Sequence, residues 1–425
     1  MRYLANCFVI GALLGGLTAC GGGDAAVTQQ DRLLIWAHEG KQVEVQVLRE
    51  QVAAFRQLHP AADIQLQFIP EADYHAQVQA AAIAGKLPDL LDLDGPYAAN
   101  YAWKGWLQPL EERLPRELAE RLLPSMRAQG RWRQSFWCVG PFDSGLGLYV
   151  NTARLPAGSE LPMTPADAWQ AGAFTALLEQ LATAERAAGE DGAVLDLRLN
   201  DRGEWWPYAF APVIWSAGAR LVGDDGRASG VLDAPAAVDA MQEVQAWIGD
   251  GLVDANTAGR AFVEGRVAFS WSGHWDYPRY AEALGDDLAL MPLPDFGAGS
   301  VTGQGSWAWA ITAAAADPDL AAAFIAFQLQ DEPVLAMTAA NGAVPATTTA
   351  VATSSLYGPD GPLALFAQQL AERARPRPVT PAYPVITDAF QEACAALRSG
   401  ADMHAALQRA AARIDRDHAD QRGYP

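Results

Sequence analysis

Tryptophans stand in several segments that the sequence predicts to be loops. The chain has 14 of them, and we expect six to lie beside strand ends and to bind ligand: Trp36, Trp205, Trp206, Trp271, Trp275 and Trp307. An indole offers a broad apolar face to the C–H face of a sugar ring, while polar groups at its edge bind the hydroxyls. This pattern favours a carbohydrate site. Core packing is the expected role of Trp103, Trp169, Trp215 and Trp247.

Carboxylates form the second part of the predicted site. Five lie beside predicted strand ends, each near a glycine or an aromatic residue: Glu39, Asp92, Asp94, Asp143 and Asp276. Carboxylates accept bidentate hydrogen bonds from adjacent hydroxyls, although any single one could equally be a solvated loop residue or a helix cap. Their convergence makes the case, together with the neighbours in the same loops: His38, Tyr97, Ser144 and Gly273. Arg375 could hold a ligand hydroxyl or carboxylate there, or form a surface salt bridge.

Alternating extended and helical patterns predict how these residues are positioned. Residues 33–37, 64–68 and 89–93 have the pattern of strands, and residues 73–85 that of a helix. Such alternation predicts an α/β fold, a parallel sheet with helices on both faces, which binds ligands at the carboxyl ends of its strands. The loops after the first and third strands then hold the first candidate residues.

A second structural unit is expected further along the chain. Its 425 residues exceed the size at which a single hydrophobic core stops growing, so two domains are predicted. The extended stretch 136–150 is interrupted at 140–145, as in a crossing between domains. A strand over 266–271 then leads into a third candidate loop, 272–276.

Several chemistries lack their motifs. There is no Gly-x-Ser-x-Gly elbow and no phosphate-binding loop, so nucleophilic hydrolysis and nucleotide binding lose their best signals. We expect no enzymatic activity and no cofactor. Scattered histidines and widely separated cysteines also argue against a metal site. The formal net charge is −20, which would repel nucleic acid.

The first residues have the pattern of a lipoprotein signal peptide. Arg2 supplies a positive charge, residues 8–19 are apolar, and residues 17–20 end in Cys20. We therefore expect a signal peptide over 1–19, a lipid on Cys20 and a flexible tether over 20–30. An ordinary secretory peptide or a transmembrane anchor are the alternatives, although the apolar run is short for a bilayer. Cys138 and Cys394 are expected as buried free thiols, although they could pair.

Several motifs, in their order along the chain, carry a resemblance to a known family. They are residues 55–60, 81–110, 147–152 (part of GLGLYVNT, which is 145–152), 164–169, 262–275 (FVEGRVAFSWSGHW), 305–311 (GSWAWAI) and 342–345. With them the chain resembles the extracellular solute-binding proteins of ABC transporters, in the sugar-binding group, and is similar to maltose- and trehalose-binding proteins.

The resemblance implies a two-lobed, type II periplasmic-binding-protein-like α/β fold. Each lobe would be a mainly parallel sheet flanked by helices, with hinge crossings and a ligand cleft between the lobes. The expected lobes are residues 31–141 plus 290–343, and residues 142–289 plus 344–425.

Carried over position by position, the resemblance suggests a set of ligand-binding residues: Glu39, Asp94, Asp143, Trp275, Gly305 and Trp307, with Arg375 a looser match. The third strand ends in Asp92, Leu93 and Asp94, where some relatives place an aromatic platform. We expect Trp205 and Trp206 to supply the stacking instead.

The predicted function is capture of a di- or oligosaccharide and its delivery to an ABC permease. The protein would be a monomer outside the cytoplasm, held to the membrane only by its lipid. A binding protein for a cationic ligand such as a polyamine is the first alternative, because acidic loops and aromatic boxes also suit ammonium groups. A glycosidase with paired carboxylates is the second.

Overall fold

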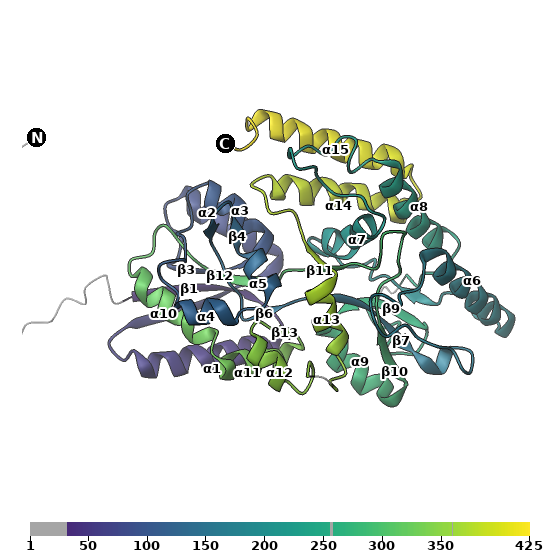
Figure 1. Cartoon of the computed structure of the whole chain (residues 1–425), viewed down its shortest axis with the longest axis horizontal. Helices are drawn as coiled ribbons and strands as arrows, with labels where there is room; N and C mark the ends of the chain where they lie inside the picture. Colours follow the sequence, from purple (N-terminus) through teal and green to yellow (C-terminus); the bar gives the residue numbers. More distant parts are fainter. Residues whose placement is uncertain (1–31, 256–257, 359) are drawn as a thin grey trace, which may run out of the picture.

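The protein has two lobes that lie side by side, each built around a four-stranded sheet (Figure 1). The computed structural model describes residues 32–255, 258–358 and 360–425. Cys20, the signal peptide and the tether lie outside the described residues. Among the helices of the described chain, none is long and apolar enough to cross a membrane.

The first sheet contains three strands that run in one direction and one that runs against them. Its strands are β1 (Arg32–Glu39), β2 (Asp63–Pro70), β3 (Leu90–Asp94) and β12 (Trp307–Ile311), in the order β12-β3-β1-β2. β1 pairs in parallel with β2 and β3, and β12 is antiparallel to β3. The three strands and the helix predicted from the first third of the sequence are confirmed.

Helices cover both faces of this sheet and bury apolar side chains against it. They are α1 (Gln42–Leu58), α2 (Glu71–Ile83), α3 (Ala98–Trp103), α4 (Arg116–Arg121), α5 (Pro124–Gln129), α10 (Pro318–Gln328) and α11 (Asp331–Asn341). In α1 the buried positions include Leu48, Val52 and Phe55, the spacing of one helix face. A hairpin of β4 (Arg131–Trp132) and β5 (Ser135–Phe136) extends this lobe.

The second sheet also has three strands in one direction and one opposed. Its strands are β7 (Leu146–Asn151), β8 (Leu195–Asp196), β9 (Phe269–Gly273) and β10 (Leu288–Met291), in the order β10-β7-β9-β8. β8 is parallel to β9, and β7 is antiparallel to both β9 and β10. The expected lobe boundary at 289 and 290 therefore falls inside β10.

The helices of the second lobe include the last ones of the chain, drawn in yellow in Figure 1. They are α6 (Ala171–Ala188), α7 (Trp205–Ser216), α8 (Pro235–Gly249), α9 (Tyr277–Leu284), α14 (Tyr383–Ser399) and α15 (Met403–Asp420). Every residue of α7 is buried, so this helix forms the centre of the lobe's core. Trp215 and Trp247 are buried in that core, and Trp103 and Trp169 pack against it, as expected.

Two pairs of short strands connect the lobes. β6 (Phe142–Asp143) pairs with β13 (Val344–Pro345), and β11 (Thr302–Gln304) pairs with β14 (Ala374–Pro376). The helices α12 (Thr348–Thr353) and α13 (Ala364–Glu372) lie between β13 and β14 in the chain. The predicted crossing near residues 140–145 is thus a pair of hydrogen-bonded strands.

The two cysteines of the described chain are free thiols, and both are buried. Burial raises the pKa of the Cys138 thiol to about 12 and also raises that of Cys394. The expectation of two buried free thiols is confirmed.

Candidate functional site

The two lobes touch through polar contacts at the edges of their sheets. Lys41, just after β1, donates a hydrogen bond from its amine to the backbone carbonyl of Trp275, just after β9. The Tyr97 hydroxyl donates to Glu204 Oε1 at 3.1 Å. Strand ends from both lobes therefore meet here. We call this region the interlobe site and define it by its side chains: Asp94, Tyr97, Asp143, Glu204, Trp205, Tyr208, Trp275, Arg377 and Tyr383.

A buried arginine holds the two lobes together at the centre of the interlobe site. Arg377 is 3% exposed and donates from both terminal nitrogens to the Asp94 carboxylate, at 2.7 and 2.9 Å. Its Nη1 also donates to Glu204 Oε2 at 2.7 Å. Asp94 ends a strand of the first lobe, and Glu204 precedes α7 of the second. The guanidinium is thus an ionic bridge between lobes.

Of the two carboxylates around Arg377, Asp94 is buried and Glu204 is partly exposed. Burial, opposed by Arg377 and reinforced by Glu204, raises the pKa of Asp94 to about 6. Glu204 accepts further hydrogen bonds from the hydroxyls of Tyr383 and Thr387. Four donors therefore surround one carboxylate that the sequence did not single out.

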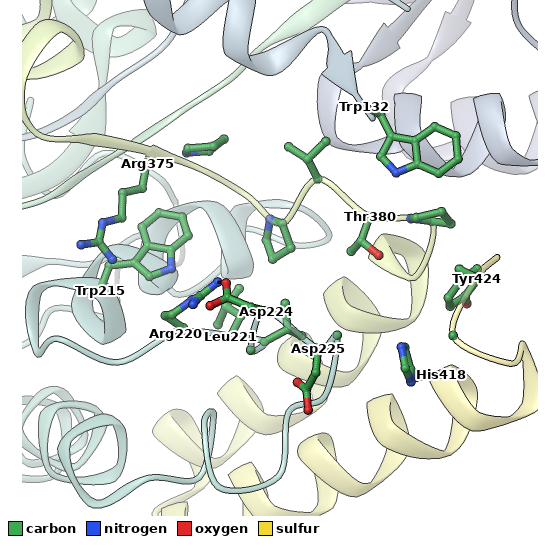
Figure 2. A pocket seen from close by; sticks show the side chains of 18 of the residues that line it. Trp132, Trp215, Arg220, Leu221, Asp224, Asp225, Arg375, Thr380, His418 and Tyr424 are labelled. Atoms are coloured by element: carbon green, nitrogen blue, oxygen red, sulfur yellow. Dashed lines mark hydrogen bonds and ion pairs between the residues drawn. The ribbon is translucent and has the colours of Figure 1, made fainter. Parts of the chain in front are cut away.

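Arg375, the predicted arginine, lies elsewhere. It is exposed, and it lines a groove of about 910 Å³ together with Trp132, Trp215, Arg220, Thr380 and Tyr424 (Figure 2). The structure therefore places Arg375 outside the interlobe site, and Arg377, two positions further on, is the residue of this segment that turns inward. Hydrophobic periodicity gives no signal in a segment this rich in proline.

The crossing between lobes brings three predicted residues together. Asp143 is fully buried and accepts hydrogen bonds from the backbone amides of Ser144 at 2.8 Å and Gly305 at 2.9 Å. Burial raises the pKa of this carboxyl. Gly305 has a φ of +104°, which only glycine adopts without strain. Ser144 in turn hydrogen-bonds His274 Nε2 at 3.0 Å.

On the first lobe, aromatic rings stack beside the site. His38 bonds Asp92 Oδ2 at 2.6 Å through Nδ1 and stacks on Trp307, with ring centroids 3.9 Å apart. Burial lowers the pKa of His38, but Asp92 outweighs it and the net pKa is raised. His75 stacks on Tyr97 at 3.5 Å, and burial lowers the pKa of His75 to about 4. One face of Trp307 is thus already covered, so that face is closed to a sugar.

On the second lobe, one partly exposed ring lies beside two buried ones. Trp275 is half-buried and lies beside Trp205 and Tyr208, with ring centroids 6.3 and 6.0 Å away. The guanidinium of Arg198 lies over the Trp205 ring at 5.0 Å and pairs with Asp276. Asp276 also accepts from Ser272 Oγ at 2.6 Å. Trp275 therefore remains a candidate for stacking, whereas Asp276 already has protein partners.

Three predicted tryptophans occupy regular elements instead of loops. Trp206 and Trp271 are 7% and 1% exposed and pack in the core of the second lobe. Trp36 lies within β1 and packs against a core cluster of the first lobe. The predicted strands 33–37 and 266–271 already contained Trp36 and Trp271, and α7 begins at Trp205. All three rings therefore pack within regular elements, and none belongs to the interlobe site as defined. Gly273 ends β9 beside the site, and Glu39 is exposed at the end of β1.

Two buried N–H donors of the interlobe site have no hydrogen-bond partner in the described part of the chain. They are the Trp205 indole Nε1 and Arg377 Nε. Buried polar groups normally find partners, so each is suited to a ligand oxygen. The described residues contain no group of three histidine, cysteine or acidic side chains that could hold a metal ion.

Sequence reasoning missed several residues of this arrangement: Lys41, His75, Arg198, Glu204, Tyr208, Arg377 and Tyr383. Glu204 directly precedes the tryptophan pair that was singled out, which was its one available signal. The others come together only in the fold; Arg377 and Asp94 are 283 positions apart.

Comparisons with known proteins agree with this architecture. The family model for bacterial extracellular solute-binding proteins matches residues 40–334. The maltotriose-binding protein of Pyrococcus abyssi is 22% identical over 270 residues, 62% of this chain and 53% of that protein. The chain therefore spans about half the length of this curated relative.

Solved structures share the fold over nearly their whole length. The GacH receptor of Streptomyces glaucescens, solved unliganded and with acarbose, has a TM-score of 0.74 at 21% identity, covering 93% of this chain and 99% of its own. The cyclic alpha-maltosyl-1,6-maltose binding protein of Arthrobacter globiformis has 0.73 at 21%, covering 91% and 98%. The maltose/maltodextrin-binding domain of Bdellovibrio bacteriovorus, bound to maltotriose, has 0.74 at 20%, covering 92% and 100%. The fold is thus the two-lobed type II fold of periplasmic binding proteins.

Proposed function

The chain belongs to the family of bacterial extracellular solute-binding proteins, and we propose that it captures a di- or oligosaccharide between its lobes and delivers it to an ABC permease. The observation that carries the sugar class is the pairing of aromatic faces with unpartnered donors. Trp205, Tyr208 and Trp275 form the aromatic wall, and Trp205 Nε1 and Arg377 Nε are buried without partners. A pyranose offers an apolar face to the first and oxygens to the second.

The relatives support the same class of ligand. Three of them are described with maltotriose, acarbose or a cyclic maltosyl-maltose, which are oligosaccharides or close analogues. A further similar structure is bound with α-D-tagatose, a monosaccharide. All of these ligands are carbohydrates or close analogues.

Ligand binding is coupled to the relative position of the two lobes. A ligand that contacts both lobes has higher affinity for the arrangement in which they meet, and it shifts the equilibrium by that difference. Arg377 stabilises this arrangement, because it already forms ion pairs with Asp94 of one lobe and Glu204 of the other. No bond of the ligand is made or broken.

The cationic alternative is less well supported by the same geometry. Three acidic groups that could hold an ammonium ion are already paired with arginines: Asp94 and Glu204 with Arg377, and Asp276 with Arg198. A polyamine would have to displace an arginine from each pair, at a large cost in desolvated charge.

Location and assembly complete the proposal. The family is extracellular, which places the protein outside the cytoplasm. We further propose a lipid on Cys20 and a monomer at the outer face of the membrane. Mass spectrometry of the mature N-terminus tests the anchor; an unlipidated start at another residue contradicts it without touching the binding proposal.

Calorimetry with a ligand panel tests the function. Maltose, maltotriose and trehalose are titrated against the protein, with spermidine as the cationic probe. We expect heat from at least one saccharide, lost in Trp275→Ala and retained in the control Trp132→Ala, which changes an indole outside the interlobe site. Binding of spermidine alone would overturn the sugar class, and shorter products from labelled oligosaccharides would overturn the transport-only role.

A further inference from the structure

The lobes make a second contact outside the interlobe site, through the residues that follow α15. The ring of Tyr424 in the second lobe packs edge-on against Trp103, at the end of α3 in the first, with centroids 4.9 Å apart and planes at 73°. Arg133, in the β4–β5 turn of the first lobe, donates from Nη2 to the Tyr424 carbonyl at 3.2 Å. Tyr424 is only 9% exposed. The contact therefore joins the lobes by a ring pair and a hydrogen bond.

The backbone at this contact is held in an unusual conformation. Arg133, Arg422 and Tyr424 have φ values of 58°, 55° and 56°. They are three of the four non-glycine residues with positive φ in the described chain. Such residues cost free energy and persist only where the surrounding contacts hold them, often at switch regions. Here they are concentrated on both sides of one lobe–lobe contact.

The segment after α15 is itself fixed to the second lobe. The Tyr424 hydroxyl donates to Asp417 of α15, and the Gly423 amide donates to the His418 carbonyl at 2.8 Å. Helix α15 packs along α14 and against α8. Tyr424 is thus fixed to the second lobe, and its ring moves together with that lobe.

The contact lies at a groove whose walls belong to different lobes. Trp132 comes from the first lobe, and Arg220 and His418 from the second, with Tyr424 beside them (Figure 2). Arg133, next to Trp132 in the chain, also lines the groove. A relative movement of the lobes must change the width of such a groove. The contacts of Tyr424 with the first lobe therefore change when the lobes move.

We propose that Tyr424 is a latch that favours the arrangement of lobes in which the interlobe contacts exist. Ring packing on Trp103 and the hydrogen bond from Arg133 form together with the Lys41 and Tyr97 contacts across the interlobe site. A ligand acts on the same equilibrium, so the latch sets part of the ligand affinity without touching the ligand. The role is independent of which solute is bound.

Small-angle X-ray scattering of the ligand-free chain tests the latch. Tyr424→Ala removes the ring, and we expect a larger radius of gyration, because the loss of an aromatic pair of this kind lowers the equilibrium constant between joined and separated lobes about fivefold. Trp103→Ala should have the same effect from the other lobe, and the double variant should add nothing. The matched control is Gln421→Ala, an exposed residue of the same segment.

Thermal unfolding and ligand titration distinguish loss of the latch from loss of the fold. Thermal unfolding identifies any variant that fails to fold. Arg133→Ala then serves as the milder perturbation, because it removes the hydrogen bond to Tyr424 and the contact of the guanidinium with the Trp132 ring but leaves the Tyr424–Trp103 ring pair in place. Maltotriose titration of Tyr424→Ala should show about fivefold weaker binding if maltotriose binds the unsubstituted chain. The proposal is overturned if folded Tyr424→Ala and Trp103→Ala scatter like Gln421→Ala, whether or not maltotriose binds.

Discussion

Replacing Arg377 by methionine should destabilise the protein at neutral pH, whereas the same replacement of Arg375 should not. Arg377 is 3% exposed and makes three hydrogen bonds to two carboxylates, while Arg375 is exposed. Removing one partner of a buried ion pair costs about 3–5 kcal/mol, because the remaining charge is left uncompensated. The Glu204 side chain is 22% exposed and partly screened by water, so we expect about 3 kcal/mol.

The pH dependence of this loss provides a second, independent number. The raised pKa of Asp94, about 6 in place of 3.8, means that the folded state binds a proton more readily than the unfolded state. The stability from this group is fully present below pH 3.8 and is lost as the pH rises through 6. As the pH falls from 7 to 5, protonation of Asp94 therefore raises the free energy of unfolding by about 1 kcal/mol.

Without Arg377, the pKa of Asp94 rises further, because the opposing cation is gone. Acidification then raises the free energy of unfolding more in the variant than in the unsubstituted protein. The variant's deficit of about 3 kcal/mol in this free energy should therefore shrink by about 1 kcal/mol at pH 5. Urea unfolding followed by tryptophan fluorescence at both pH values measures this difference. A deficit below 1 kcal/mol at pH 7, or a loss as large in Arg375→Met, would show that the buried bridge is not formed in solution.

Three further predictions follow from single positions. Gly305→Ala should cost about 1–2 kcal/mol in urea unfolding, because the φ of +104° is strained for alanine while its Cβ would meet only ordinary contacts; a neutral result would refute that backbone conformation. Trp275→Ala should weaken saccharide binding at least about tenfold by calorimetry, with little loss of stability, since the ring is half-buried; equal affinity would remove it from the site. Cys138 and Cys394 should not react with a thiol reagent until the protein unfolds, because both are buried with raised pKa values; labelling of the native protein would contradict this.

The parts of the fold and site that the sequence predicted are those that local pattern determines. Strand ends follow from apolar runs, so Asp94 and Asp143 were placed correctly at the edge of a sheet and at a crossing. Gly305 was found through the resemblance, and its left-handed backbone explains why glycine is needed there. Local pattern is enough for such residues because their position depends on the element beside them.

The parts that could not be predicted depend on contacts between distant segments. Glu204 and Arg377 meet across 173 positions of the chain, and no periodicity in either segment indicates it. Trp206 and Trp271 were misplaced for the opposite reason: aromatic residues that suit a sugar equally suit a core, and only packing decides between them. Pattern therefore locates candidate residues, and the tertiary fold selects among them.

The interlobe site separates two tasks that a single set of residues could not perform equally well. Charged groups pair with one another across the lobes, with Arg377 bridging Asp94 and Glu204, and they cannot be given to a neutral ligand without leaving a buried charge unpaired. In the proposed binding mode, recognition is left to groups that a neutral sugar can satisfy at low cost: the rings of Trp205 and Trp275 and the two unpartnered N–H donors. A ligand that needed the carboxylates themselves would have to break the bridge that brings the lobes together, which is the physical reason for preferring a neutral saccharide to a cation.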